Sequence, residues 1–321
     1  MIMWLLRKYR LHLLVTLALV GLLASFMIAS PQTFLSMRIY RSFMSTIPVT
    51  AILALGMTLL VVVGEMDLSF PSIAAAASYF FAEIFVRTGS LLLAFLGAMV
   101  SGVFMGWINA IVVVRIGVPS IIATIGTQFF WRGLILLLSD GVAISLAEIR
   151  GSLLHLLFVG RIGGEIPAQT VWCLALAVLL AFILNRHIFG DALLFIGDNR
   201  RTALMMGVPV AKVRTKAFVL MGVLSAFAGL LSTFELANWW PTQGEGYMLL
   251  VFASVFVGGT SAYGGEGTIY GSLIGAAIIG IIEAGIVSAG LAGFWTRLVY
   301  GLIIVVSVSI YTLMARRGGT S

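Results

Sequence analysis

Ten long apolar segments dominate this sequence and limit the folds that it can adopt. A helix needs about 20 mostly apolar residues to cross a bilayer. By that measure the segments lie at 12–30, 43–63, 71–86, 91–114, 120–138, 168–185, 217–238, 247–259, 269–288 and 294–314. Only 10% of the 321 residues are charged, whereas a soluble domain carries about 25%. The sequence therefore predicts an all-α, polytopic membrane protein with about ten transmembrane helices in a single domain, 1–321, embedded in the lipid bilayer.

The distribution of Lys and Arg predicts how these spans are oriented. With ten spans, twelve of the nineteen basic residues fall on one side and five on the other. The richer side includes Arg7, Lys8, Arg316 and Arg317 at the two ends of the chain. Because loops rich in Lys and Arg stay in the cytoplasm, we expect both termini to be cytoplasmic. The longest cytoplasmic loop is then 186–216.

Side chains for covalent or metal chemistry are scarce. The single cysteine, Cys173, and the histidines His12, His155 and His187 have no spacing that is typical of a disulfide framework, a zinc site or a nucleophile with its base. We therefore expect no catalytic residue, no metal and no cofactor on this chain. The net charge of +7 is spread as a topology signal rather than gathered in a patch, which argues against a nucleic-acid partner.

One apolar segment is interrupted at VVVGEMDLSFPS, residues 61–72. Pro71 cannot donate to a helical ladder, and Asp67 or Ser69 can cap a new helix. Freed backbone groups and carboxylates at membrane depth face protein or water, and interrupted helices often line transporter sites. We therefore predict that Gly64, Glu65, Asp67 and Ser69 form part of a translocation path or hinge. The alternative is a cytoplasmic turn with Asp67 as the N-cap.

A second irregular stretch, NWWPTQGEGY at 238–247, follows the seventh span as the first stretch follows the second span. Each carries a Gly-Glu pair, and the third and eighth segments that come next are short for a full crossing. This pairing favours inverted repeats over spans 2–5 and 7–10, although Gly-rich turns are common between helices. Gln243 and Glu245 are therefore further candidates for the path or hinge.

Several polar residues fall in or near the spans. Arg132, Glu235, Glu283 and Arg297 either pair structurally or belong to a solute or ion pathway. Asn109 and Gln128 are expected to form hydrogen bonds between helices.

Glycines recur every four residues in two places. Gly102 and Gly106 lie in the fourth span, and Gly267, Gly271 and Gly275 lie near the ninth. This spacing places each set on one side of a helix and predicts close helix packing. The stretch 257–280 contains no Gly-x-x-x-x-Gly-Lys-[Ser/Thr] phosphate loop and follows no predicted strand, so its glycines do not indicate a nucleotide-binding loop.

The loop 186–216 contains a predicted short helix outside the membrane. Asp198 or Asn199 can cap it, RRTALMM forms about two turns, and Gly207 followed by Pro209 can end it. Its apolar side chains, Leu204, Met205 and Met206, would be exposed without a partner. Either a groove on a partner protein covers them, or the helix rests on lipid headgroups.

Four blocks of the chain resemble the permease subunits of bacterial ribose-type ABC importers. They are LALGMTLLVVVGEMDLSFPSI, PSIIATIGTQFFWRGLILLL, IGDNRRTALMMGVPVAKVRTKAFVLMG and VFVGGTSAYGGEGTIYGSLIGAAIIGIIEAGI. The resemblance implies a pair of permease subunits, identical or related, in the bacterial inner membrane. It also implies an ATPase that binds ATP and Mg on the cytoplasmic face, and a periplasmic solute-binding protein. The expected activity is import of a sugar or sugar-like solute, such as a pentose, hexose or polyol.

The same resemblance assigns roles to individual residues. The family's Gly-x-Asn block falls on Gly197 to Asn199 and continues to Ala203 and Gly207, where it is similar to the coupling helix that docks on the ATPase. Its matching residues and their neighbours are Gly197, Asp198, Asn199, Arg200, Ala203 and Gly207. The family's Gly-Gly-Ile-Asp-Leu-Ser-Val-Gly segment keeps Gly64, Asp67, Leu68 and Ser69 here. It departs at Glu65, Met66, Phe70 and Pro71.

A second class of function also fits the residues. An ion-coupled secondary transporter could use Glu65, Asp67, Glu235 or Glu283 to carry protons or sodium. The energy source distinguishes the two classes, because only the secondary transporter would concentrate solute without an ATPase.

Overall fold

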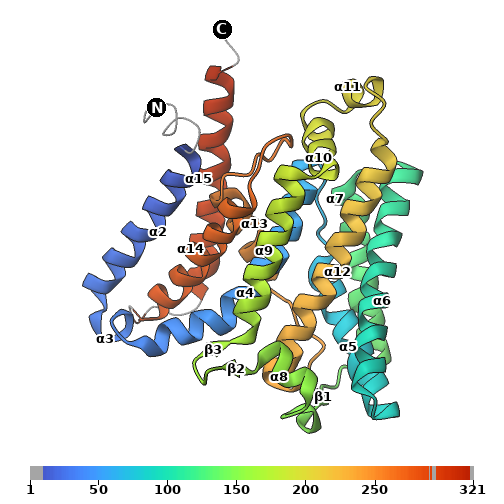
Figure 1. Cartoon of the computed structure of the whole chain (residues 1–321), viewed down its shortest axis with the longest axis vertical. Helices are drawn as coiled ribbons and strands as arrows, with labels where there is room; N and C mark the ends of the chain where they lie inside the picture. The colour runs from blue at the N-terminus through green and yellow to red at the C-terminus, as the bar shows by residue number, and fades with distance from the viewer. Residues whose placement is uncertain (1–9, 289, 291–293, 319–321) are drawn as a thin grey trace.

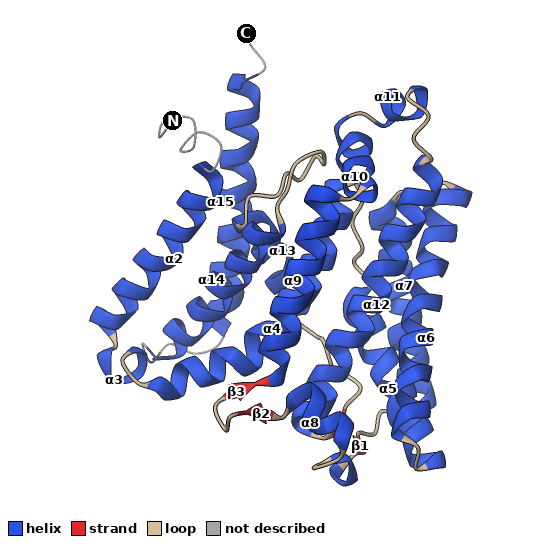
Figure 2. Ribbon diagram, viewed as in Figure 1, coloured by secondary structure: helices blue, strands red, loops and turns tan. Residues whose placement is uncertain are grey.

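The computed structural model describes residues 10–288, 290 and 294–318, so the predicted basic residues Arg7 and Lys8 lie outside the described residues. The fold is helical almost throughout (Figure 2). Within the described residues, every predicted span is a helix. These helices are α2 (Arg10–Ala29), α4 (Met37–Val62), α5 (Phe70–Thr88), α6 (Leu91–Ala110), α7 (Ser120–Leu138), α9 (Ala168–Arg186), α12 (Val210–Leu236), α13 (Tyr247–Val257), α14 (Ile269–Ser288) and α15 (Phe294–Gly318).

Seven of the described helices are long and apolar enough to cross a membrane, and two apolar helices are shorter. The shorter ones are α13 and the stretch Phe294–Ser309 of α15. The prediction of an all-α, polytopic membrane protein is therefore confirmed. The eighth predicted segment is indeed too short for a full crossing, because α13 has 11 residues and a span needs about 20.

Small elements complete the fold at the two ends of the bundle. They are α3 (Pro31–Phe34), π-helical η1 (Ile111–Ile116), η2 (Ala147–Ile149), α8 (Leu153–Val159), α10 (Ile188–Asp198) and α11 (Arg200–Met205). Strand β1 (Ile144–Ser145) pairs antiparallel with β4 (Asn238–Trp239), and β2 (Arg161–Ile162) pairs antiparallel with β3 (Ile166–Pro167). The β1–β4 pair ties the loop between α7 and α9 to the stretch that follows α12.

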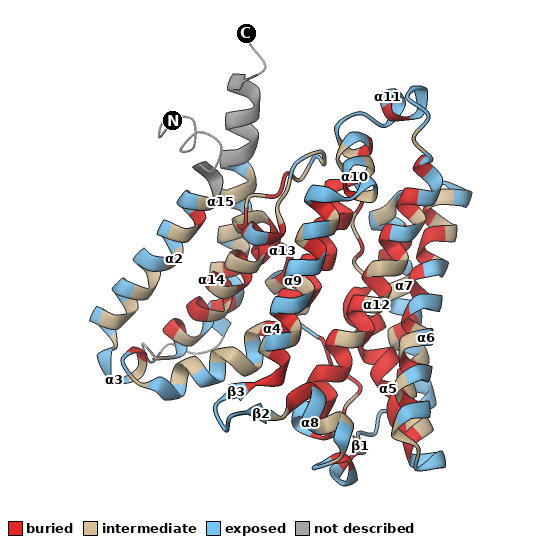
Figure 3. Ribbon diagram, viewed as in Figure 1, coloured by how far each residue is buried: buried red, intermediate tan, exposed pale blue. Residues whose placement is uncertain are grey.

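The core of the bundle consists of α4, α5 and α12. In the apolar 18-residue stretch of α4 and in that of α12, 78% of the residues are buried, whereas in α2 the share is 6%. The buried faces of the surrounding helices turn toward this centre, and exposed apolar residues lie on the outside (Figure 3). A helix that is apolar all round belongs in a protein interior or a membrane. The outer helices therefore present lipid-facing surfaces, while α4 and α12 are enclosed by protein.

The packing of the helices repeats between the two halves of the chain. Helix α5 packs against α6 and α7, as α13 packs against α14 and α15. Likewise α12 packs against α5 and α6 of the first half, as α4 packs against α13 and α14 of the second. Helix α4 starts at the edge that carries α3, whereas α12 starts at the opposite edge below α11 (Figure 1). This arrangement is the one expected of inverted repeats over spans 2–5 and 7–10.

One face of the bundle gathers both ends of the described chain. Helix α2 begins, and α15 ends, at the same edge as α10 and α11 (Figure 1). We call this edge the α11 face, and the edge that carries α3, α8 and the strands the α8 face. Arg115, Arg186 and Arg200 belong to segments that reach the α11 face. These three basic residues thus lie in segments on the face that the sequence predicted to be the richer in Lys and Arg.

Some boundaries differ from those predicted, and α4 begins at Met37 instead of 43. Helix α12 begins at Val210, not at 217, so Lys212, Arg214 and Lys216 lie in its first turns instead of in the loop 186–216. The apolar signal could not reveal this, because those turns carry three charges. Gly267 was expected to share a helical face with Gly271 and Gly275, but α14 begins only at Ile269. Gly267 lies in the preceding loop, against Val62 and Thr260.

Candidate functional site

The first break in the bundle, residues 63–69, follows α4. Gly64 has φ +83°, a left-handed conformation that favours glycine, and the Glu65 amide still donates to the Leu60 carbonyl at 2.9 Å. The chain then runs into the bundle and starts α5 with Pro71 in the first turn. Ser69 is the N-cap residue, but its side chain makes no capping hydrogen bond. The predicted side-chain cap from Asp67 or Ser69 is therefore wrong.

Asp67 instead holds the break against α6. Its carboxylate accepts from the Ser69 amide at 2.7 Å and from the Ser69 hydroxyl at 2.6 Å. Asn109 Nδ2 donates to Asp67 at 3.1 Å and to the Ser69 hydroxyl at 2.7 Å, and Asn109 Oδ1 accepts from Thr127 at 2.7 Å. Asp67, Ser69 and Asn109 are all 0% exposed. This closed network favours the hinge over the path, and Asn109 bonds between helices as expected.

Glu65 makes the second polar contact of this break. It forms an ion pair with Arg214 in the first turns of α12, and Arg214 Nε donates to Glu65 Oε1 at 2.7 Å. The pair is buried, with exposures of 9% for Glu65 and 4% for Arg214. Both residues line a 320 Å³ cavity that also includes Arg200 of α11. Sequence reasoning treated Arg214 only as a topology signal, because its partner lies 149 positions away.

The second break, residues 237–246, follows α12 at the α8 face. Gln243 is 0% exposed, and its Nε2 donates to the Gly229 carbonyl at 2.9 Å and to the Thr233 hydroxyl at 3.1 Å. Arg132 of α7 donates to the carbonyls of Pro241 and Gln243. Arg132, in the fifth predicted span, thus provides hydrogen-bond donors for two backbone carbonyls of the break. Gln243 therefore anchors the break.

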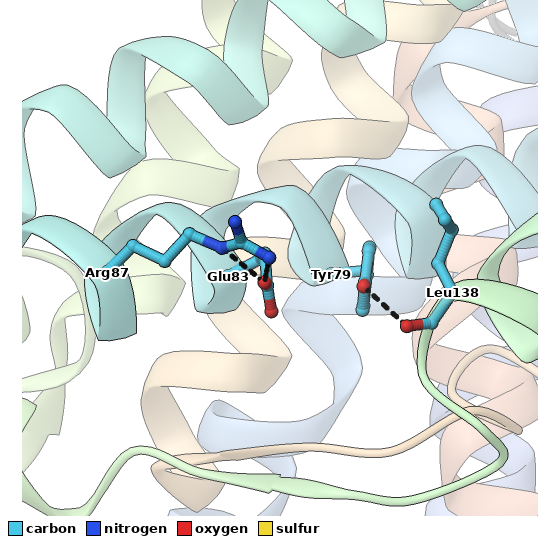
Figure 4. A network of polar contacts seen from close by, with 4 residues as sticks. All are labelled: Tyr79, Glu83, Arg87 and Leu138. Atoms are coloured by element: carbon cyan, nitrogen blue, oxygen red, sulfur yellow. Dashed lines mark hydrogen bonds and ion pairs between the residues drawn. The ribbon is translucent and has the colours of Figure 1, made fainter.

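Helix α5 supports this second break from the side. The Trp239 indole donates to the Ala75 carbonyl at 2.9 Å, and its ring lies 5.0 Å from the Tyr79 ring, centroid to centroid. The Tyr79 hydroxyl donates to the Leu138 carbonyl at 3.1 Å, and farther along α5 Glu83 and Arg87 form an ion pair (Figure 4). These contacts connect the end of α7 and the part of α5 around Tyr79 with the second break, residues 237–246.

The two breaks approach one another inside the bundle. Gly244, with φ +82°, packs so closely on Pro71 that an added Cβ would lie 2.9 Å from the Pro71 carbonyl oxygen. Pro71 lies in the first turn of α5, and Gly244 lies just before α13. The first turn of α5 and the turn just before α13 therefore meet in the interior, as the two halves of an inverted repeat would bring them together.

A cavity of 640 Å³ opens beside the second break. Its walls come from α4, α12, α13 and α14, with Gln169 from α9. Glu235, Glu245 and Glu283 line it together with hydroxyl side chains such as Thr46 and Ser232. Ligand pockets usually measure about 300–1,000 Å³, so this space suits a small solute. Of the residues predicted for the path, Glu245 lines this cavity, whereas Gly64 and Glu65 line the smaller one near α11.

The predicted surface helix is α11. Asn199 is its N-cap, and its side chain accepts from the Thr202 amide at 3.0 Å, so Asn199 and not Asp198 caps the helix. Gly207, with φ +80°, follows its end. Ala203 is buried, whereas Leu204, Met205 and Met206 are 56%, 75% and 65% exposed. The helix thus offers an apolar edge at the α11 face and leaves Arg200 at its start.

A junction of glycine backbones connects α10 to the first break. An added Cβ at Gly197 would overlap the Val62 carbonyl oxygen and the Gly265 amide. The Gly265 amide donates to that same Val62 carbonyl at 2.9 Å, and Gly264 packs on Gly64. The end of α4, the end of α10 and the loop 258–268 are therefore in direct contact. Close packing leaves no space between α10 and the end of α4 at this junction.

The predicted packing glycines lie at helix contacts. An added Cβ at Gly102 would lie 2.7 Å from the Gly222 carbonyl oxygen, and one at Gly106 would lie 3.1 Å from Val219 Cα. These contacts bring α6 against α12. Gly271 and Gly275 similarly bring α14 against the carbonyls of Gly258 and Ser254 at the end of α13.

Comparison with known proteins identifies the family. The family described as "Branched-chain amino acid transport system / permease component" matches residues 39–308. The chain belongs to this permease family. The ribose import permease protein RbsC of Bacillus subtilis (strain 168) is 32% identical to this permease over 265 residues, covering 82% of this chain and 81% of the relative.

Two further relatives extend this comparison. RbsC of Escherichia coli (strain K12) is 30% identical over 310 residues, covering 96% of the permease and 94% of the relative. The L-arabinose ABC transporter permease protein AraH of Azospirillum brasilense is 28% identical over 278 residues, covering 86% and 80%. The resemblance to sugar ABC permeases is therefore confirmed. The permease is a multi-pass transport subunit and not itself an enzyme.

Proposed function

We propose that this permease is the membrane subunit of an ATP-driven importer that carries a sugar or sugar-like solute, such as a pentose, hexose or polyol, into the cytoplasm. It works with a second permease subunit, identical or related, in the bacterial inner membrane. An ATPase binds ATP and Mg at the α11 face, which is cytoplasmic together with both termini. A solute-binding protein delivers solute at the α8 face.

The observation that carries this proposal is the link between α11 and the first break. Helix α11 exposes an apolar edge, which a groove on a partner protein can cover. Helix α10 precedes it directly, and the glycine junction at Gly197 joins α10 to the end of α4. A push on α11 therefore reaches both the break at 63–69 and, through Arg214, the start of α12.

The placement of the two cavities supports alternating access. The 640 Å³ cavity lies beside the second break, and the 320 Å³ cavity lies beside the first. Near both breaks, the first turn of α5 meets the turn just before α13. A shift of α4 and α12 relative to these turns would close one cavity and enlarge the other, as in transporters that rock one repeat against the other. The permease supplies the path, and the ATPase supplies the energy.

The docking role of α11 can be tested by replacing Gly207 with Trp. The bulky side chain at the exposed end of α11 should prevent close docking. In proteoliposomes with the companion ATPase and binding protein, we expect ATP hydrolysis to continue while uptake falls by about tenfold, the size of a change of about 1.4 kcal/mol. Radiolabelled-solute uptake and phosphate release are measured on the same preparation.

Two control variants separate bulk from backbone strain. Gly207→Ala introduces a Cβ at the same left-handed φ without the bulk, and Gly163→Trp places the same bulk at a left-handed glycine (φ +63°) on the other face. Both should retain most of the uptake. Full uptake by Gly207→Trp would contradict the docking assignment. Accumulation of solute by the permease alone, driven by an ion gradient and indifferent to ATP, would instead establish a secondary transporter.

A further inference from the structure

The 320 Å³ cavity near α11 carries a surplus of positive charge. Its walls come from the first break, η1, the start of α7, α11 and α12. The charged side chains among its described lining residues are Glu65, Arg200 and Arg214. Because Glu65 and Arg214 form an ion pair, the charge of Arg200 is left over. Arg115 adds a further exposed cation on η1.

Arg214 has hydrogen-bond donors that its ion pair does not use. The residue is 4% exposed, and its polar contacts with the described residues run from Nε and Nη2 to one oxygen, Glu65 Oε1. A guanidinium group has five N–H donors, so Nη1 is left without an acceptor among these residues. A buried donor without an acceptor is unfavourable. Because Arg214 lines the cavity, its remaining donors favour a ligand that accepts hydrogen bonds.

Arg200 is the second cation of the cavity wall. It is exposed on α11 and takes part in none of the ion pairs among the described residues, although Asp198 lies two positions away. Its neighbour Arg201 is exposed as well but does not line the cavity. The wall therefore combines a buried guanidinium that Glu65 holds in place with an exposed guanidinium that can move onto a ligand.

The first turn of α7 contributes backbone donors to the same cavity. Pro119 and Ser120 line the cavity, and no side chain caps this end of the 19-residue helix. The first amides of a helix have no partner within the helix, and its N-terminal end attracts anions such as phosphate. Together with the two arginines, these amides favour an anion that has several oxygen atoms.

Exposed apolar side chains adjoin this polar cavity. Ile116 on η1 is 68% exposed, and Ile121 and Ile122 in the first turn of α7 are 47% and 64% exposed. Val113 and Val114 form part of the cavity wall itself. Lipid tails are as apolar as such side chains. The cavity thus offers donors for a charged headgroup next to a surface that suits an acyl chain.

We infer that this cavity binds the phosphate group of an anionic phospholipid, such as phosphatidylglycerol or cardiolipin. Arg200 and Nη1 of Arg214 donate to the phosphate oxygens, and an acyl chain lies along Ile116 and Ile122. Basic pockets between helices on the cytoplasmic side suit such headgroups, and the α11 face is cytoplasmic in the proposed orientation. Glu65 repels the phosphate, but Arg214 balances its charge. This site goes beyond the proposed function, because its ligand is a lipid and not the solute.

The test measures lipid binding to the full-length permease by native mass spectrometry. The purified permease is titrated with phosphatidylglycerol or with phosphatidylcholine of the same acyl chains, which has no net charge. The first bound phosphatidylglycerol should bind more tightly than the first phosphatidylcholine. Arg200→Gln should weaken phosphatidylglycerol binding by about fivefold, the effect of one basic residue beside an anionic lipid, and should leave phosphatidylcholine binding unchanged.

A matched control uses the neighbouring residue. Arg201→Gln removes the same charge from the next position of α11, outside the cavity wall, and should bind both lipids like the parent. Equal binding of the two lipids by the parent would overturn the inference. Phosphatidylglycerol binding that Arg200→Gln retains, or that both variants lose equally, would overturn it as well.

A competition arm separates a lipid headgroup from free phosphate. The phosphatidylglycerol titration is repeated in the presence of inorganic phosphate. Lipid binding should persist, because the acyl chain adds contacts that free phosphate lacks. Displacement of the lipid by inorganic phosphate would assign the cavity to a free anion and overturn the lipid assignment. None of these results bears on the proposed function, since ATP-driven uptake by the full importer tests that separately.

Discussion

The two breaks of the bundle occupy corresponding places in the two halves, but their polar groups are used differently. In the first break, Asp67 is 0% exposed and its carboxylate accepts from Ser69 and Asn109, and Glu65 is paired with Arg214. In the second, Gln243 is enclosed in the same way, but Glu245 is exposed to a 640 Å³ cavity. A break in a membrane helix thus needs enclosed polar side chains that hydrogen-bond to its backbone. Other polar side chains of the break are then free to line a cavity.

The largest effect is expected from the buried ion pair of the first break. Arg214→Ala leaves Glu65 buried without its partner, which should lower the free energy of unfolding by about 3–5 kcal/mol. Denaturant unfolding of the purified permease in detergent measures this loss. The double variant Glu65→Ala/Arg214→Ala removes both charges and should be less destabilised than Arg214→Ala.

Lys212→Ala is the control, because it removes an exposed charge on the same helix. It should change the free energy of unfolding by no more than about 0.5 kcal/mol. If Arg214→Ala behaves like Lys212→Ala, the pair does not close the first break.

A smaller effect is expected from the hydrogen-bond network of the same break. Asp67→Ala leaves the buried donors of Ser69 and Asn109 unsatisfied, which should cost about 1–3 kcal/mol. Asp67→Asn keeps one acceptor oxygen in place and should cost less. The same unfolding measurement applies to both variants. A loss for Asp67→Asn as large as that for Asp67→Ala would mean that charge, and not hydrogen bonding, holds the break.

The smallest effect on stability is expected in the second break. Glu245→Ala removes an exposed carboxylate and should change the free energy of unfolding by no more than about 0.5 kcal/mol, although it should reduce uptake. Unfolding and uptake are measured on one preparation. Destabilisation comparable to that of Asp67→Ala would erase the difference between the two breaks.

Much of the fold could be predicted because apolar length is a local property. Each predicted span is a helix, and the interruption at residues 63–69 lies within the stretch 61–72 where the sequence placed it. The start of α12 was missed because its first turns are not apolar. They contain the charged residues Lys212, Arg214 and Lys216.

The candidate site was harder to predict, because its contacts join residues that lie far apart in the sequence. Glu65 and Arg214 are separated by 149 positions, and Gln169 and Glu235 by 66. No periodicity links such pairs. Glu235 and Glu283 could be singled out from their position near spans, but only the structure brings them with Glu245 around one cavity.

The shortness of α13 has an electrical consequence. Its 11 residues make it about 16 Å long, roughly half of the 30 Å hydrocarbon thickness, and the cavity reaches its first turn at Tyr247 and Leu250. In the proposed orientation, water in that cavity would carry the potential of the outer solution deep into the bilayer. The membrane voltage would then fall across little more than this one short helix, where 100 mV is worth about 2.3 kcal/mol per unit charge. Any charge that passes α13 would therefore cross most of the membrane voltage in one step.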